Sequence, residues 1–433
     1  MTEPTNLDWA EIIKNAPLSW QRVKFGDVFV ERKEKDYVDL PLLSVTRTGL
    51  VYQHETERRD TSRSNKSSYL RVLPGDIAYN TMRMWQGVSV YCDKEGIVSP
   101  AYTVMRPKES LEGRFIAVLL KFQPLVRRFR AQSQGLVSDT WNLKFKHLAQ
   151  IPTVIPPLPE QKKIAAILAS VDEAIEATEA VIEQTRRVKK GLLQELLTRG
   201  IGHTSFKKTA IGEIPEAWDV KRLRELVVEK GLQTGPFGSQ LHASEYIEDG
   251  VPVVMPKDIE GTRISCDDIA RIPLSKANEL RKHHLEDGDI IFGRRGDIGR
   301  CALVEKGPLM LCGTGCLRAR PDDRLFSAFL IEYLQTWTAQ YFLETNAVGQ
   351  TMLNLNTKIL GSLPIAVPPK KEQIEIAGIL RAVTQQIAEH KIPLEQMKKL
   401  KKGLLQDLLT GKVRVNVDDV AEEVRETAEA MAE

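Results

Sequence analysis

The chain has 433 residues and a formal net charge of +3, and 42% of its residues are hydrophobic and 27% charged. This length exceeds one ordinary domain of about 100 to 200 residues, and the composition excludes both a disordered and a membrane-embedded chain. No run approaches the roughly 18 apolar residues of a spanning helix, and the start carries acids where a signal peptide carries positive charge, so we expect two or three domains in the cytoplasm.

The first segment, residues 1–156, has short β-like runs broken by turns, with strand-like residues 87–91 and a helix-like stretch at 114–129. Its loop-like parts bring basic and aromatic side chains together, at Arg47, Arg58, Arg59, Arg63, Lys66, Arg83 and Trp85. Because Arg and Lys neutralise phosphates and Arg also grips guanine edges, the cluster favours DNA binding. The alternative is a solvated surface, which is the commoner role of any single residue among them.

A long helix is predicted over residues 157–200, because Pro156 and Pro157 exclude helix upstream and Gly200 is a natural stop. About 40 residues make a rod of roughly 60 Å. Its apolar residues follow the alternating three- and four-residue steps of a coiled-coil seam, at Ile164, Leu168, Val171, Ile175, Ile182, Leu192 and Leu196. Lys189 takes a seam position where an apolar residue is expected.

Residues 201–214 form a polar linker, and residues 215–368 form a second domain of mixed α+β pattern. Residues 251–254 and 288–292 are strand-like, and residues 328–344 are helix-like. Basic residues again gather in its loop-like parts, at Lys257, Arg263, Arg281, Lys282, Arg294, Arg295 and Arg300. The same argument favours DNA over a solvated surface.

The segment 369–412 predicts a second long helix that repeats the first. Residues 372–410 match residues 160–198 without a gap, with 19 of 39 positions identical. Its seam comprises Ile376, Leu380, Val383, Ile387, Leu394, Leu404 and Leu408, and Lys401 is the equivalent of Lys189. The domains before the helices also align, since Asn142-Leu143 corresponds to Asn354-Leu355 and Trp20 to Trp218.

This repeat predicts a pseudo-two-fold chain in which the two helices pair as an antiparallel coiled coil. The alternative is two unrelated surface helices, each packed on its own domain. Pro393 removes a backbone hydrogen bond from the second helix, so we expect a kink near His390.

The remaining residues give no sign of catalysis or metal binding. Five cysteines are an odd number for a disulfide framework and suit reduced, buried thiols, and neither Cys312 with Cys316 nor His283 with His284 completes a metal site. No P-loop, GxSxG or complete dinucleotide motif is present. The tail at 413–433 holds seven acids and one base after residue 415, so the rest of the chain is about nine charges positive, which suits a polyanionic partner.

Together these features resemble the specificity (S) subunit of type I restriction-modification systems, over nearly the whole chain. The resemblance rests on residues 155–161 followed by Ile164-Ala165, on the Lys-Lys-Gly-Leu-Leu-Gln endings that begin at Lys189 and Lys401, and on residues 212–215 and 234–239. It implies that each domain is a target recognition domain for one half of a split DNA site. The helices would then set the gap between the halves.

The resemblance also implies partners: double-stranded DNA, two DNA-adenine methyltransferase (M) subunits and restriction (R) subunits. S-adenosylmethionine (AdoMet), ATP and Mg would be bound by those subunits, leaving no catalytic residue, metal or cofactor in this chain. The DNA-side positions that it implies in the second domain are Gly235, Phe237, Gly238, Ser239, Gln350 and Asn354, with a second loop at 294–300. The first domain lacks the Gly-Pro-Phe-Gly phrase, so the loop that enters the groove there stays open.

Two other classes compete with this interpretation. A fused methyltransferase or nuclease would need an AdoMet-binding fold and an Asn/Asp-Pro-Pro-aromatic motif, and neither is found in the sequence. A coiled-coil scaffold without a nucleic-acid role would bind its partners with little dependence on salt, whereas DNA affinity falls steeply with salt.

Overall fold

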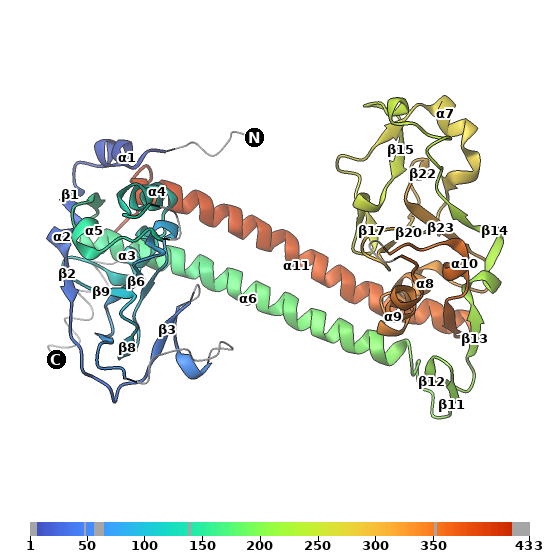
Figure 1. Ribbon diagram of the computed structural model, residues 1–433, viewed down its shortest axis with the longest axis horizontal. Coiled ribbons are helices and arrows are strands. Elements are labelled where there is room, and N and C mark those ends of the chain that lie inside the picture. The colour runs from blue at the N-terminus through green and yellow to red at the C-terminus, as the bar shows by residue number, and fades with distance from the viewer. Residues whose placement is uncertain (1–6, 47–48, 56–64, 137–139, 350–352, 418–433) are drawn as a thin grey trace. The chain divides into compact units, whose positions relative to one another are not determined.

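The computed structural model describes residues 7–46, 49–55, 65–136, 140–349 and 353–417, and it divides into two compact units. Unit 1 comprises residues 1–178 and 393–433, and unit 2 comprises residues 179–392. The long helices α6 (Leu158–Leu196) and α11 (Lys370–Thr410) each contribute to both units. Each unit therefore contains one globular domain, the start of one long helix and the end of the other (Figure 1).

Unit 1 is built on a four-stranded antiparallel sheet in the order β2 (Phe29–Arg32), β9 (Tyr102–Pro107), β6 (Ile77–Asn80), β7 (Ser89–Tyr91). Smaller pairings join β1 (Gln21–Lys24) to β10 (Pro152–Ile155), β3 (Leu43–Val45) to β4 (Leu50–Tyr52), and β5 (Leu70–Val72) to β8 (Gly96–Val98). The short helices are α1 (Trp9–Asn15), α2 (Phe25–Val28), α3 (Gly113–Leu119), α4 (Gln123–Gln132) and α5 (Phe145–Leu148).

Unit 2 repeats this plan. Its main sheet has the order β14 (Val227–Thr234), β23 (Cys316–Pro321), β20 (Ile290–Gly293), β21 (Cys301–Leu303). A second sheet has the order β18 (Arg271–Ile272), β15 (Val251–Val254), β22 (Met310–Cys312), β19 (His284–Leu285). The two-stranded pairs are β11 (Phe206–Thr209) with β12 (Gly212–Pro215), β13 (Asp219–Arg222) with β24 (Pro364–Val367), and β16 (Ile259–Glu260) with β17 (Arg263–Ile264). The short helices are α7 (Leu274–Glu279), α8 (Ser327–Tyr333), α9 (Trp337–Asn346) and α10 (Thr357–Gly361).

The equivalent strands also share their register. Ile77 lies opposite Tyr91 in unit 1, and Ile290 lies opposite Leu303 in unit 2. The Gly-Asp-Ile phrase that begins each strand forms a turn, in which the buried carboxylate of Asp76 or Asp289 accepts a backbone N–H three residues earlier. The relation between the two domains that the sequence predicted is therefore confirmed at the level of strand pairing.

Several expected boundaries shift. The strand expected at 251–254 is β15, but those expected at 87–91 and 288–292 begin only at Ser89 and Ile290, because Gly87 and Gly288 adopt left-handed φ values of 76° and 87° within turns. The helices expected at 114–129 and 328–344 are each two helices, α3–α4 and α8–α9. Pro124 in the first turn of α4 and the N-cap Thr336 of α9 begin the second helix of each pair. The polar linker contains the hairpin β11–β12, which the sequence pattern did not predict.

The two long helices form as predicted. Helix α6 begins directly after Pro157, and Gly200 beyond its end has a left-handed φ of 68°. Helix α11 continues through Pro393, so the proline does not end it, and the kink near His390 stays a prediction. All fourteen residues of the predicted seams are buried or half-buried. No helix in the described ranges is both long enough and apolar enough to span a bilayer.

Each unit uses helix ends from both repeats in its hydrophobic core. In unit 1, Ile164 and Leu168 of α6 pack in one cluster with Leu408 of α11. In unit 2, Leu196 of α6 packs in one cluster with Ile376 of α11. The two polar seam positions are ion-paired, since Lys401 binds Asp172 of α6 and Lys189 lies 3.2 Å from Glu332 of α8. Each domain therefore packs on a helix pair and not on its own helix alone.

The Glu of the repeated Glu-Gln phrase connects each helix start to the segment after the other helix. Glu160 accepts the indole N–H of Trp20 at 2.9 Å and the guanidinium of Arg414 at 2.6 and 2.9 Å. Glu372 accepts the indole N–H of Trp218 at 3.0 Å and the backbone N–H of Ile201 at 3.0 Å, and it lies 2.9 Å from His203 Nε2. The same carboxylate thus holds the equivalent tryptophan in both units.

The Gln of that phrase is fully buried and forms three hydrogen bonds in each unit. Gln161 Nε2 donates to Pro156 O (2.8 Å) and Ser110 O (3.0 Å), and its Oε1 accepts from Glu112 N (2.8 Å). Gln373 makes the matching bonds to Pro368 O, Arg324 O and Phe326 N, at 2.9, 2.9 and 2.7 Å. The amide therefore fixes the start of each long helix against the segment that leads into α3 or α8.

Candidate nucleic-acid interface

The loop after β20 gathers most of the second-domain candidates. Arg294 is half-buried, and its Nε donates to Asn354 Oδ1 at 2.9 Å and to Leu355 O at 3.2 Å. Its guanidinium carbon also lies 5.9 Å from the centre of the Phe237 ring. Arg294 thus brings together three segments that are distant in sequence, while its neighbour Arg295 is exposed to solvent. This loop is the structure's clearest candidate for a base-reading element in unit 2.

The segment 235–239 lies beside this loop, and its first glycine has a structural role. Gly235 is buried, and a Cβ there would lie 1.9 Å from Gly313 O. Thr314 Oγ1 donates to Pro236 O at 3.0 Å, and Arg294 N donates to Gly315 O at 2.8 Å, which joins the two loops. Gly235 therefore allows close backbone packing, and the exposed positions that could meet DNA are Phe237, Gly238 and Ser239.

The other basic candidates of unit 2 differ in whether an acidic side chain lies beside them. Arg300 pairs with Asp297 and donates to Pro256 O at 3.2 Å. Lys257 donates to Asp268 O at 2.9 Å and lies 3.6 Å from the carboxylate of the same residue. Arg263 is exposed on β17. The structure therefore brings Arg294 and Asn354 together, whereas Arg300 and Lys257 each have an acidic neighbour.

The structure identifies the equivalent loop of unit 1, which the sequence left open. Leu143 N donates to Thr81 O at 2.8 Å, as its sequence equivalent Leu355 N donates to Arg294 O at 2.9 Å. Gly87 and Gly299 end the two loops, both with left-handed φ. A Cβ on Gly87 would meet Val126 of α4, and one on Gly299 would meet Gln340 at the equivalent position of α9. Residues 81–87 therefore correspond to residues 294–299.

Two sequence candidates lie on this first-domain loop. Arg83 is exposed, and Trp85 is half-buried, with its indole N–H donating to Met82 O at 2.9 Å. Trp85 meets Trp141 edge to face, with ring centres 5.4 Å apart. Lys66 is half-buried in the turn before β5. The candidates Arg47, Arg58, Arg59, Arg63 and Gln350, and the acidic tail from residue 418, lie outside the described residues.

Sequence reasoning missed several exposed cations because it searched loops rather than helices. Arg128 and Arg130 are exposed on α4, and Arg130 lies over the Trp141 ring, 5.2 Å from its centre. Arg114 and Lys121 are exposed on and after α3. Two tertiary contacts connect them with the loop at 81–87, since Trp141 meets Trp85 and the Lys121 backbone lies beside Gly87.

The thiols and histidines form no metal site in the part of the chain that the structure describes, where no three His, Cys, Asp or Glu side chains cluster. Cys92, Cys301, Cys312 and Cys316 are buried free thiols, as expected, but Cys266, in the irregular segment after β17, is exposed. His283 is buried with Nδ1 2.9 Å from Thr234 O, and burial lowers its pKa to about 4. His283 therefore serves as a neutral hydrogen-bonding residue beside the start of the 235–239 segment.

This histidine predicts a pH dependence of stability. Its folded pKa of about 4 lies below the ordinary value of 6.5, so the unfolded chain binds the proton first as pH falls. The stability from neutral His283 is complete above pH 6.5 and is lost towards pH 4, by at most about 3 kcal/mol. We expect His283→Asn, which keeps a donor for Thr234 O, to flatten this part of the unfolding free energy measured with denaturant. Identical pH profiles for both proteins would contradict the assignment.

Comparison with known proteins identifies the family. A family model described as the type I restriction modification DNA specificity domain matches the chain twice, over residues 17–185 and 215–397. The chain belongs to this family. The two matches cover both globular domains and most of both long helices, in agreement with the repeat in the fold.

Individual relatives agree with this family. The chain is 26% identical over 419 residues to the type I restriction enzyme MjaVIII specificity subunit of Methanocaldococcus jannaschii, covering 92% of this chain and 94% of that one. It is 26% identical over 294 residues to the EcoKI specificity subunit of Escherichia coli, covering 63% and 59%. A crystal structure of a type I S subunit from M. genitalium shares the fold, with a TM-score of 0.55 at 16% identity, covering 94% of this chain and 98% of that one. The chain is thus a specificity subunit, a non-catalytic member of a type I system.

Proposed function

We propose that this specificity subunit reads a bipartite DNA sequence, with one half-site assigned to each unit. The observation that carries the proposal is the equivalence of the loops at 81–87 and 294–299, which occupy the same place in two copies of one fold. Their side chains differ, since the first is Thr-Met-Arg-Met-Trp-Gln-Gly and the second Arg-Arg-Gly-Asp-Ile-Gly. Equivalent positions with different donors suit two half-sites of different sequence.

We further propose that α6 and α11 pair as an antiparallel coiled coil that sets the gap between the half-sites. Two observations support it. The seam residues are the buried side of both helices, and within unit 1 the end of α11 packs on the start of α6 through Leu408 and the Lys401–Asp172 ion pair. The equivalent ends share a core in unit 2. A chain built this way presents two reading domains at a separation that helix length determines.

The proposed partners follow the resemblance. Two methyltransferase subunits would dock on the two pseudo-symmetric halves, and restriction subunits would join them. AdoMet, ATP and Mg would then act on those chains. The target adenine would be flipped into the methyltransferase, which leaves this chain the task of recognition.

The test is the methylation pattern that the chain directs. The chain is co-expressed with its methyltransferase subunit in cells that lack adenine methylation, and the genome is sequenced for methyladenine. We expect one split motif with two fixed half-sites and a constant gap. Methylation at scattered sites, or at one continuous motif, would contradict the proposed function.

A further inference from the structure

The two equivalent loops carry unequal positive charge. The loop at 81–87 has a single cation, Arg83, whereas the loop at 294–300 has three arginines and one aspartate. DNA binding needs cations near the phosphates as well as donors for the bases. Unit 1 therefore has to supply these cations from outside its loop if both units bind DNA alike.

The helices that flank the loops differ in the opposite direction, because those of unit 1 carry the additional positive charge. Apart from Arg127, whose guanidinium donates to Leu7 O at 2.7 Å, four exposed cations on α3, α4 and the segment between them have no cationic counterpart in unit 2. In order they are Arg114, Lys121, Arg128 and Arg130, and the equivalent residues of unit 2 are Ala328, Gln335, Phe342 and Glu344. The charge that unit 2 places in its loop is thus placed on helices in unit 1. We call these four residues the helical basic set.

Contacts connect the helical basic set with the loop. Arg130 stacks over Trp141, whose ring meets Trp85 of the loop edge to face. At the other end of the loop, a Cβ on Gly87 would lie 3.6 Å from the Lys121 backbone. One cation therefore flanks the loop through an aromatic pair, and another adjoins its last residue.

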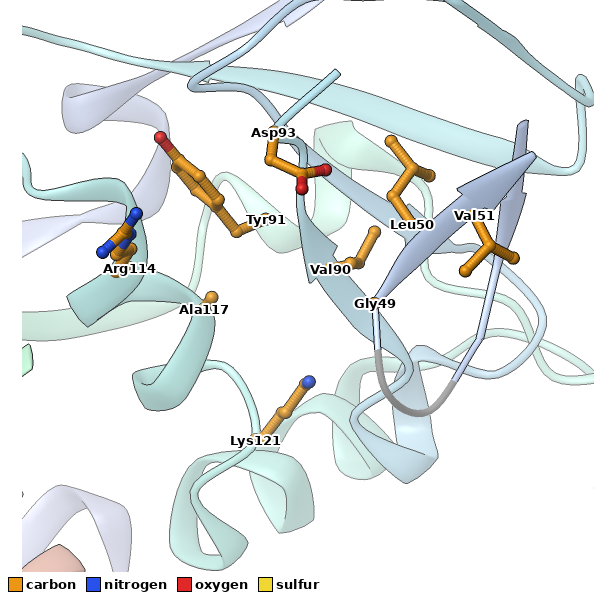
Figure 2. Close-up of a pocket in the computed structure, with 9 residues that line it drawn as sticks. All are labelled: Gly49, Leu50, Val51, Val90, Tyr91, Asp93, Arg114, Ala117 and Lys121. Atoms are coloured by element: carbon orange, nitrogen blue, oxygen red, sulfur yellow. The ribbon is translucent and has the colours of Figure 1, made fainter. Parts of the chain in front are cut away.

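Lys121 and Arg114 also line an open pocket of about 410 Å³, shown in Figure 2. Both side chains come from the α3 side, opposite the hairpin β3–β4, and Tyr91 and Asp93 are among the other lining residues. At the equivalent strand of unit 2, Leu303 N of β21 instead donates to Thr262 O of the β16–β17 hairpin at 3.1 Å. Unit 1 therefore has solvent-accessible room beside its cations.

Acids near the set partly offset its charge, since Asp172 acts on Lys121 and Asp93 lines the pocket beside it, but they do not pair with it. Among the described residues, no ion pair involves Arg114, Lys121, Arg128 or Arg130. Desolvation by the surrounding protein, and then the nearby charge of Lys401, lower the pKa of Lys121 although its side chain is exposed. An anion bound beside Lys121 would offset this repulsion.

We propose that the helical basic set is a phosphate-binding face by which unit 1 holds the DNA backbone beside its reading loop. The inference rests on the proposed function, because it takes DNA as the ligand. It assigns different roles to the loop and to the helical basic set. Arg83 and its loop would read bases, and Arg114, Lys121, Arg128 and Arg130 would supply affinity without sequence preference.

The salt dependence of DNA binding tests this face. The complex with the methyltransferase is titrated with a duplex carrying its motif, at 50 to 200 mM salt, and log K is plotted against log salt. Replacing the four cations with Gln should make the slope shallower by about 0.9 for each phosphate that is no longer neutralised. For each such phosphate, the loss of affinity between 50 and 200 mM salt should become about 3.5-fold smaller. The methylated motif should stay the same.

Matched variants identify what the result means. Lys14→Gln with Lys162→Gln removes exposed cations of α1 and α6 and should leave the slope unchanged. Arg83→Ala should instead relax one half-site and weaken binding roughly 5- to 150-fold. A wild-type slope in the fourfold variant would overturn the inference and leave the proposed function intact. Loss of methyltransferase co-purification by this variant, with normal DNA binding, would have the same meaning. Absence of salt-dependent DNA binding by the wild-type complex would overturn both.

Discussion

Four residues inserted into each long helix should widen the gap of the recognised motif by one to two base pairs and leave both half-sites unchanged. Four helical residues add about 6 Å, and DNA rises about 3.4 Å per base pair. The insertions belong after Thr178 in α6 and after its repeat equivalent His390 in α11, close to the boundaries between the units at residues 178 and 392. The measurement is the methylated motif in cells.

The structure explains why both helices must be lengthened and where. Each helix contributes residues to the cores of both units, so lengthening one alone would pull a buried segment out of place. An insertion at Gln194 would separate Leu193 from Leu196, both of which pack in unit 2. A variant with four substitutions and no added length is the control. A changed half-site, or an unchanged gap in a folded protein, would contradict the spacer model.

Replacement of Gln161 by Leu should strongly destabilise unit 1. It removes three hydrogen bonds from a buried site and leaves Pro156 O, Ser110 O and Glu112 N without those partners. At about 1 kcal/mol for each lost bond, with more for polar groups left buried, we expect a loss of about 3 to 5 kcal/mol in the unfolding free energy. Denaturant unfolding with a probe in unit 1 measures it.

The repeat supplies matched controls for this substitution. Gln373→Leu should destabilise unit 2 by a similar amount, because its three bonds are equivalent. Lys162→Leu changes the exposed next residue and should have little effect. Gln161→Glu keeps the acceptor for Glu112 N and should lose less than Gln161→Leu. Equal stability of Gln161→Leu and Lys162→Leu would show that the buried amide has no such role.

Local sequence patterns predicted the elements whose causes are local. The Pro-Pro pairs and the apolar spacing were sufficient for α6 and α11, and the strand-like runs at 87–91 and 288–292 marked β7 and β20 within two residues. Helix breaks at α3–α4 and α8–α9 were missed, because apolar periodicity continues across them. The hairpin β11–β12 was missed because its residues are mostly polar.

The sequence by itself determined that this chain is a duplicated member of the specificity family with two DNA specificity domains and two long helices, because residues that repeat at a constant offset are visible without the structure. Only the tertiary structure decided which loop of unit 1 corresponds to the loop at 294–299 of unit 2. That correspondence depends on the hydrogen bonds of Leu143 and Leu355 and on glycines packed against α4 and α9. The structure also shows that helices of unit 1 bring cations to this loop, since Arg130 contacts Trp141 and Trp141 contacts Trp85. A linear sequence pattern does not contain such packing between distant segments.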